Sequence, residues 1–132
     1  MKIVVIDGQG GKIGRAIIEE LKLNKTNAEI IAVGTNSAAT ATMLNAKADE
    51  GATGENAVIS NCRDADYIIG PIGIIVADAL HGEVSPQMAV AIGQSKAKKI
   101  LLPITRCNTY VVGVQEKRIE ELIELITAEI EC

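Results

Sequence analysis

Short apolar segments recur along the chain and are separated by segments that are apolar on one side only. Four of the apolar segments are rich in Ile, Val or Leu and have the length of strands that are buried on both faces of a parallel sheet. These predicted strands are residues 2–7, 29–34, 66–70 and 99–102.

The segments between the predicted strands have helical periodicity. In residues 12–23, Ile13, Ile17 and Leu21 follow one another at the spacing of one helical face. Other helices are expected from Asn36 or Ser37, as N-cap, to about residue 46, over a short stretch ending near Cys62, and from Ser85-Pro86 to Gly93. A final amphipathic helix is expected over residues 119–130.

Three segments are less regular. Residues 46–56 are polar and glycine-containing, which predicts a loop. Residues 72–80 favour a strand by propensity but a helix by their place in an alternating chain. Residues 110–114 have strand propensity, and because only about seven residues join them to the preceding strand, the pair is expected to be antiparallel or splayed apart.

This alternation predicts an α/β protein with a three-layer Rossmann-like fold. We expect one domain over residues 1–132, with a mostly parallel sheet of about five strands whose last strand is antiparallel or splayed apart. Ligands of such sheets bind beyond the carboxyl ends of the strands, where the strand order reverses. If the first strand is central, residues 8–11, 70–73 and 103–108 surround that place.

Composition narrows the classes of function. The chain has 132 residues and a net charge of -4, and it lacks Phe and Trp, which disfavours nucleic-acid binding and a polybasic membrane anchor. The longest apolar stretch is broken by glycines and a proline, so no membrane span is expected. Three cysteines without metal-ligand spacing favour reduced thiols in the cytoplasm over disulfides or a metal site.

A glycine-rich turn between the first strand and the first helix is the sharpest signal. Gly8, Gly11 and Gly14 form a G-x-x-G-x-x-G pattern. We expect Gly8 to permit the tight turn, Gly10 or Gly11 to let a phosphate approach backbone N–H groups, and Gly14 to let the helix pack close to the sheet. The alternative is a tight connection that binds no ligand.

The end of the second strand bears on the kind of nucleotide. An NAD site places an acidic residue there for the ribose hydroxyls, whereas this chain has Thr35, Asn36 and Ser37. Hydrogen bonds from these residues to a 2′-phosphate would favour NADP. Equally, they would serve only to cap the next helix.

Other candidates lie near the same edge of the predicted sheet. Gly70 and Pro71 end the third predicted strand, and Arg106 follows the fourth. Cys107 is interpreted as a small turn thiol rather than a nucleophile, and His81 as a surface or capping residue. The candidate cofactor-binding residues are Gly8, Gln9, Gly10, Gly11, Lys12, Ile13, Thr35, Asn36, Ser37, Gly70, Pro71 and Arg106, and no catalytic residue is assigned.

Two resemblances add to these patterns. The run from Gly8 to Arg15 resembles the cofactor loop of dihydrodipicolinate reductases, which implies a dinucleotide site, but the catalytic stretch and second domain of those enzymes are missing. Nearly the whole chain resembles a family of short Rossmann-like proteins from anaerobic Gram-positive bacteria, which is classified as a domain of unknown function. The resemblance includes VIDGQGGKIG, IIGPIGIIVA and KKILLPITRCN.

Three functions are consistent with the sequence. The first is binding of a nucleotide or NADP-like dinucleotide by a sensor or partner subunit. The second is a small oxidoreductase whose site a second subunit completes, with a contribution from Cys107 or His81. The third is a ligand-free interaction protein. A surplus of aliphatic residues for this size predicts a homo-oligomer.

Overall fold

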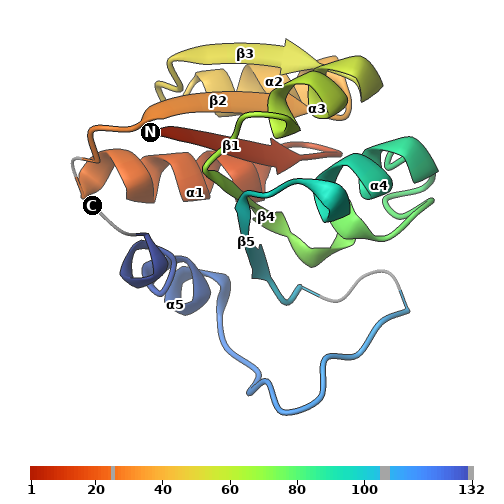
Figure 1. The fold of residues 1–132 in the computed structure, drawn as a ribbon. Helices are drawn as coiled ribbons and strands as arrows, with labels where there is room; N and C mark the ends of the chain where they lie inside the picture. Colours follow the sequence, from red (N-terminus) through yellow and green to blue (C-terminus); the bar gives the residue numbers. More distant parts are fainter. Residues whose placement is uncertain (25, 105–107, 131–132) are drawn as a thin grey trace.

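A single parallel sheet forms the middle layer of the protein. The computed structural model describes residues 1–24, 26–104 and 108–130. Within these residues, five strands lie in the order β3-β2-β1-β4-β5, and all four neighbouring pairs are parallel (Figure 1). The strands are β1 (Lys2–Asp7), β2 (Glu29–Gly34), β3 (Glu50–Thr53), β4 (Tyr67–Pro71) and β5 (Lys98–Leu102). The predicted α/β class and three-layer Rossmann-like fold are confirmed.

Helices cover both faces of the sheet. One face packs against α1 (Lys12–Leu23), α2 (Ser37–Leu44) and α5 (Ile119–Glu124). The other packs against α3 (Glu55–Cys62), α4 (Pro86–Gln94) and the short 3₁₀ helix η1 (Ile72–Ile75). Successive residues of β1 point to opposite faces, so Ile3 and Val5 enter the first core and Val4 and Ile6 the second.

Local sequence signals place most of the elements correctly. Asn36 is the N-cap of α2, where its side chain accepts a hydrogen bond from the Ala39 N–H. Ser85 caps α4 in the same way, and Pro86 occupies the first helical position. β1 is the central strand, and its register pairs Val4 with Ile31 on one side and with Ile68 on the other.

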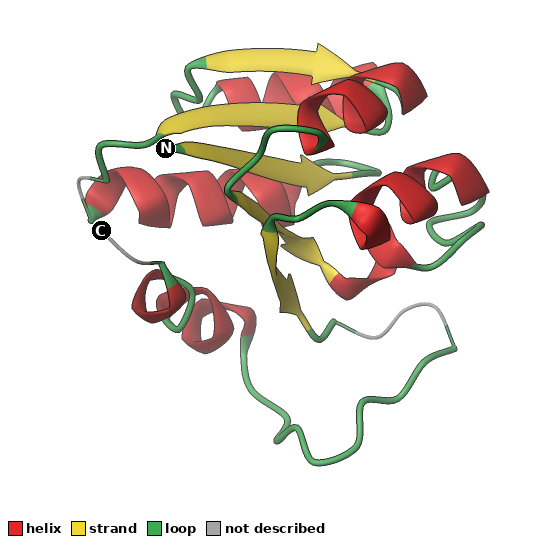
Figure 2. Ribbon diagram, in the orientation of Figure 1, coloured by secondary structure: helices red, strands yellow, loops and turns green. Residues whose placement is uncertain are grey.

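The expected strand at residues 110–114 is wrong. These residues lie in a long connection between β5 and α5, and the described part of this connection has no strand partner (Figure 2). Strand propensity measures how well side chains fit a pleated, half-buried surface, so it forms no strand without a neighbour. The expected antiparallel last strand is therefore also wrong, because the last strand is β5 and it runs parallel to β4.

The fifth strand comes instead from the expected loop at residues 46–56. β3 pairs with β2 at the edge of the sheet, and most of its residues are exposed. An edge strand buries little, so it lacks the apolar run that marks the other strands.

The two remaining irregular segments are mainly turns and 3₁₀ helix. Residues 72–80 begin with η1 and continue as turns, which is neither of the two expected structures. The last helix is shorter than expected, because α5 stops at Glu124 and the 3₁₀ helix η2 (Thr127–Glu129) follows it. Among the described residues, no helix has the length and apolar character that crossing a membrane requires.

Gly70 is a packing residue of the sheet. It is buried in β4, and a Cβ atom added there would overlap the backbone oxygen of Ile6 in the adjacent strand. Because that oxygen belongs to the central strand, it has little freedom to move. The structure therefore assigns Gly70 to close strand packing, although the sequence indicates it as a candidate site residue.

Substitution of this glycine tests the packing. We expect Gly70→Ala to lower the free energy of unfolding by about 1–3 kcal/mol, as overpacking does in well-packed cores. Gly93 is the matched control, because a Cβ at this exposed position of α4 meets no atom within 4 Å. Gly93→Ala should be neutral or stabilising in urea denaturation, and equal stabilities of the two variants would contradict the packing role of Gly70.

Candidate functional site

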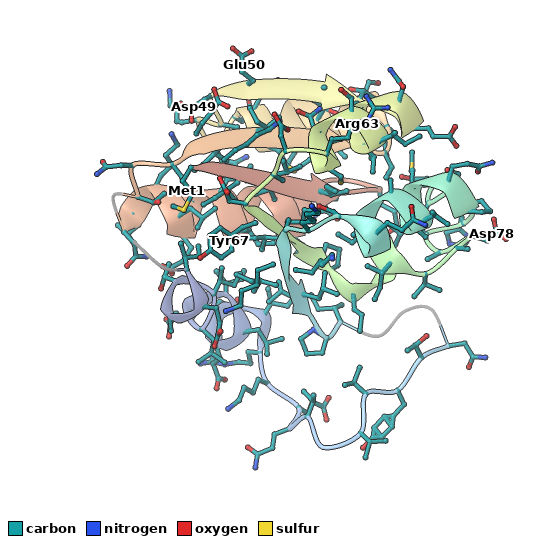
Figure 3. The ribbon with its side chains drawn as sticks, viewed as in Figure 1. Met1, Asp49, Glu50, Arg63, Tyr67 and Asp78 are labelled. Atoms are coloured by element: carbon teal, nitrogen blue, oxygen red, sulfur yellow. The ribbon has the colours of Figure 1, made fainter. Side chains whose placement is uncertain are left out.

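The glycine loop, residues 8–11, stands where the strand order of the sheet reverses. The chain passes from β1 outward to β2 and β3 and then returns to β4 on the other side of β1. In open α/β sheets, the crevice at such a reversal is the usual ligand site. Figure 3 shows Asp78, from the segment after β4, at the side toward which β1 points, whereas Met1 lies at the opposite side.

A cavity of about 430 Å³ lies beside the glycine loop. We call it the loop cavity. Its walls come from the end of β1 and the start of α1, from the residues that follow β4, and from the two ends of the β5–α5 connection. The lining residues are Asp7, Gly8, Gln9, Gly10, Gly11, Lys12, Ile13, Pro71, Gly73, Leu80, Ile104 and Ile119.

Gly11 and Gly14 hold the helix against its neighbours. Gly11 is the N-cap of α1 with a φ of 73°, and its N–H donates to the Gly8 oxygen at 2.9 Å. A Cβ at Gly11 would lie 2.7 Å from the backbone oxygen of Ala39 in α2, and one at Gly14 would overlap Met43. Gly11 is therefore required for packing against α2, and its N–H is already engaged by the Gly8 oxygen.

Gly10 faces open space. A Cβ added there meets no protein atom within 4 Å, and the residue is exposed and lines the loop cavity. Its φ lies outside the left-handed region that favours glycine. The backbone at Gly10 is thus accessible to a bulky group from outside the chain.

The buried side chain of Asp7 stabilises the turn through hydrogen bonds. It is only 4% exposed, and its two carboxylate oxygens accept hydrogen bonds from the N–H groups of Gly8 and Gly14 at 2.8 and 2.7 Å. Burial, the largest influence, raises the pKa of Asp7, and the charge of Glu83 raises it further against the lowering effect of the N–H groups. The side chain braces the loop from the inside.

Glu83 is a second carboxylate that binds the loop. Its Oε1 accepts hydrogen bonds from the Gln9 N–H at 2.9 Å, the Thr35 hydroxyl at 2.7 Å and the Asn36 side-chain amide at 2.8 Å. Desolvation is the largest influence on its pKa and acts to raise it. The three hydrogen bonds and the charge of His81 outweigh desolvation, so the pKa of Glu83 is lowered and the carboxylate is ionised at neutral pH.

The segment that carries Glu83 has an unusual backbone. Asp78, Leu80 and His81 have left-handed φ values of 68°, 57° and 57°. The Asp78 N–H donates to the Val84 oxygen at 2.7 Å, which closes the segment into a compact turn. It brings Leu80 onto Gly8, where an added Cβ would lie 2.7 Å from Leu80 Cδ1. Gly8 therefore makes room for this segment.

The structure brings together part of the predicted site. Residues 8–13 and Pro71 line the loop cavity. Thr35 and Asn36 lie beside the loop, but their side chains bind Glu83, and Asn36 also caps α2. Ser37 is exposed as the first residue of α2, outside the cavity lining. Arg106 and Cys107 lie outside the described residues.

Glu83 and Leu80 are absent from the residues that the sequence indicates. Glu83 is separated from Gln9 by 74 positions, and no motif links the two. Only the tertiary path of the chain brings them into contact. His81 is exposed and does not line the loop cavity, in keeping with its interpretation as a surface residue.

Four N–H groups at this turn have partners in the protein. Those of Gly8 and Gly14 donate to Asp7, that of Gln9 to Glu83, and that of Gly11 to the Gly8 oxygen. Within the described part of the chain, the N–H groups of Gly10 and Lys12 have no protein acceptor. The first turn of α1 has no acidic side chain, and Lys12 begins it. The arrangement suits a negatively charged group.

The raised pKa of Asp7 makes stability depend on pH. The folded protein holds the Asp7 proton more tightly than the unfolded chain does. The free energy of unfolding therefore falls as pH rises from the ordinary pKa of 3.8 through the higher pKa of the folded state. We expect the stability of the wild type to fall relative to Asp7→Asn over that window. Urea denaturation of both proteins between about pH 4 and 7 measures this difference, and a relative rise would mean that the N–H groups outweigh burial.

Comparisons with known proteins place the chain in a family. None of the curated proteins matches it. Among solved structures, a dodecameric FMN-dependent Ubix-like decarboxylase from Escherichia coli O157:H7 aligns with a TM-score of 0.47 and 17% identity, over 99% of this chain and 96% of that one. The domain of unknown function DUF3842 matches residues 2–132. The chain therefore belongs to the DUF3842 family.

Proposed function

We propose that this protein binds a nucleotide whose phosphate lies on the glycine loop and the N-terminus of α1. The observation that carries the proposal is that the N–H groups of Gly10 and Lys12 lack protein acceptors at the wall of a cavity at the strand-order reversal. Helix N-termini in this position hold phosphates in many α/β proteins, because the N–H groups and the helix dipole both favour an anion.

Charges of both signs surround the loop. The carboxylates of Asp7 and Glu83 already accept hydrogen bonds from Gly8, Gln9 and Gly14, so they do not compete for the N–H groups of Gly10 and Lys12. Lys12 is exposed at the start of α1 and lines the loop cavity, so it adds a positive charge to the surroundings of those two groups. A phosphate at Gly10 can therefore accept hydrogen bonds from these N–H groups although two carboxylates lie nearby.

The remaining wall of the loop cavity suits a nucleoside. Leu80, Ile104 and Ile119 are apolar, and Pro71 adds a rigid surface. A volume of about 430 Å³ lies within the ~300–1,000 Å³ that small-molecule sites usually have. The proposal covers binding. Among the described lining residues, the side chains with an acid or base group are Asp7 and Lys12, and two backbone N–H groups engage Asp7.

A charge at Gly10 tests the phosphate site. Gly10→Asp should weaken the binding of AMP, ADP or NAD by about tenfold or more, because its carboxylate repels the phosphate. The fold should be unaffected, since a side chain at Gly10 meets open space. Isothermal titration calorimetry measures the affinities. Gly93→Asp, on the exposed part of α4, is the control with the same net charge.

Two results would count against this site. Wild-type protein that binds none of AMP, ADP, NAD or inorganic phosphate would remove the proposal altogether. Equal affinities of the Gly10→Asp and Gly93→Asp variants would show that a nucleotide binds elsewhere.

We also propose that a second copy of the chain covers part of the β5–α5 connection. Tyr110 and Val112 are 76% and 86% exposed, and Val114 is also exposed. A segment with strand propensity and no strand partner in the described chain is prone to pair with another molecule. The same connection ends at Ile119, which lines the loop cavity, so a partner there would extend the cavity wall.

Sedimentation velocity tests this self-association. We expect the wild type to sediment as a dimer or larger oligomer and Val112→Glu to shift it to the monomer, because a buried unpaired charge is costly at an interface. Val90→Glu is the matched control, since Val90 is an exposed valine on α4. A monomeric wild type, or dissociation by Val90→Glu alone, would contradict the assignment of the interface to residues 110–114.

A further inference from the structure

Only one oxygen of the Glu83 carboxylate accepts hydrogen bonds from the described residues. Oε1 accepts all three of its hydrogen bonds, from Gln9, Thr35 and Asn36. No donor among the described residues reaches Oε2. An ionised carboxylate has about four lone-pair sites, so Oε2 keeps the capacity to accept hydrogen bonds from a ligand. The three donors on Oε1 meanwhile hold the group in one orientation.

Glu83 is held at the end of β2, where dinucleotide-binding sheets have the acidic residue of their ribose site. In those sheets, an acidic residue at the end of the second strand binds the ribose hydroxyls. Here the end of β2 supplies only Thr35 and Asn36, and both hold Glu83 by hydrogen bonds across about fifty residues of chain. A third bond links Glu83 to Gln9 in the glycine loop. The end of β2 has no acidic residue in its sequence, but the fold brings Glu83 to that place, next to the proposed phosphate site.

The surroundings of Glu83 oppose a second phosphate. Its contacts are neutral donors, and the buried carboxylate of Asp7 lies close enough for the two charges to influence each other. No Lys or Arg side chain among the described residues contacts Glu83. A 2′-phosphate at this place would meet the like charge of Glu83, and no Lys or Arg would compensate it, although the charge of exposed His81 also acts on this carboxylate.

We infer that Glu83 makes the site select nucleotides with a free ribose 2′-hydroxyl, such as AMP or NAD, over 2′-phosphorylated ones, such as NADP. This inference rests on the proposed nucleotide-binding function. It replaces the preference for NADP that the polar end of the second strand suggests from sequence. Thr35 and Asn36 orient the selecting carboxylate, and they do not bind a phosphate themselves.

A matched pair of ligands tests the selection. AMP and adenosine 2′,5′-bisphosphate differ only by the 2′-phosphate. We expect the wild type to bind AMP more tightly by about tenfold or more in calorimetric titration, since like-charge contact is costly. Glu83→Gln retains an oxygen acceptor and removes the charge, so this preference should fall by about tenfold. Thermal unfolding without ligand shows whether the variant remains folded.

Glu50→Gln is the matched control, because Glu50 is an exposed carboxylate on β3, far from the loop cavity (Figure 3). It should leave the ratio of affinities unchanged. If the wild type binds the two ligands equally, or if Glu83→Gln leaves their ratio as in the wild type, the inference about Glu83 is wrong while nucleotide binding stands. If neither ligand binds the wild type, the proposed function and the inference both fail. The wild-type ratio alone decides the matter should the variant not fold.

Discussion

The turn from β1 to α1 depends on a buried carboxylate. Asp7 ends the central strand, and its two oxygens bind the Gly8 and Gly14 N–H groups on either side of the turn. A short turn over the end of a sheet leaves several N–H groups without helix or sheet partners, and buried ones need acceptors. By accepting from two of them, Asp7 fixes the path of the chain between Gly8 and Gly14. The N–H groups of Gly10 and Lys12 on that path have no acceptor among the described residues.

Two carboxylates that bind one loop have different environments and therefore different roles. Asp7 is buried, which raises its pKa, and its contacts are internal to the turn. Glu83 has more donors and less burial, so its pKa is lowered and it retains a charge with one oxygen unused. Asp7 thus stabilises the loop, whereas Glu83 gives the loop's outer side a fixed negative charge. Different environments can separate the pKa values of two neighbouring carboxylates and thereby give them different roles.

The sequence predicts those parts of the fold that depend on local chemistry. The apolar run of β1, the glycine turn and the caps at Asn36 and Ser85 each specify their structure within a few residues. β3 escapes prediction because an edge strand with exposed Glu50 and Gly51 carries little apolar signal. Residues 110–114 show the opposite case. They have strand propensity and are predicted as a strand, but they have no strand to pair with in the described chain.

The candidate site divides in the same way. Residues 8–13 form one continuous segment, so their pattern reveals the loop. Gly11 and Gly14 are required by contacts with Ala39 and Met43 in α2, which no local pattern shows. The partner of Thr35 and Asn36 lies about fifty residues away, so the sequence shows two polar side chains and not the carboxylate that they orient. A ligand preference inferred from Thr35 and Asn36 alone therefore changes once Glu83 is known.

The backbone before Glu83 gives this placement a structural cost. Left-handed conformations at Asp78, Leu80 and His81 are each unfavourable for residues with a Cβ atom, by roughly 1 kcal/mol or more. The hydrogen bond from Asp78 to Val84, the packing of Leu80 on Gly8 and the three bonds to Glu83 offset that cost. A relaxed turn would carry Glu83 away from the glycine loop. Left-handed backbone also occurs at Gln9, Lys47 and Asn108, but three of the six such non-glycine residues in the described chain lie in this one segment. The segment whose position sets the charge at the proposed ribose site therefore concentrates this strain.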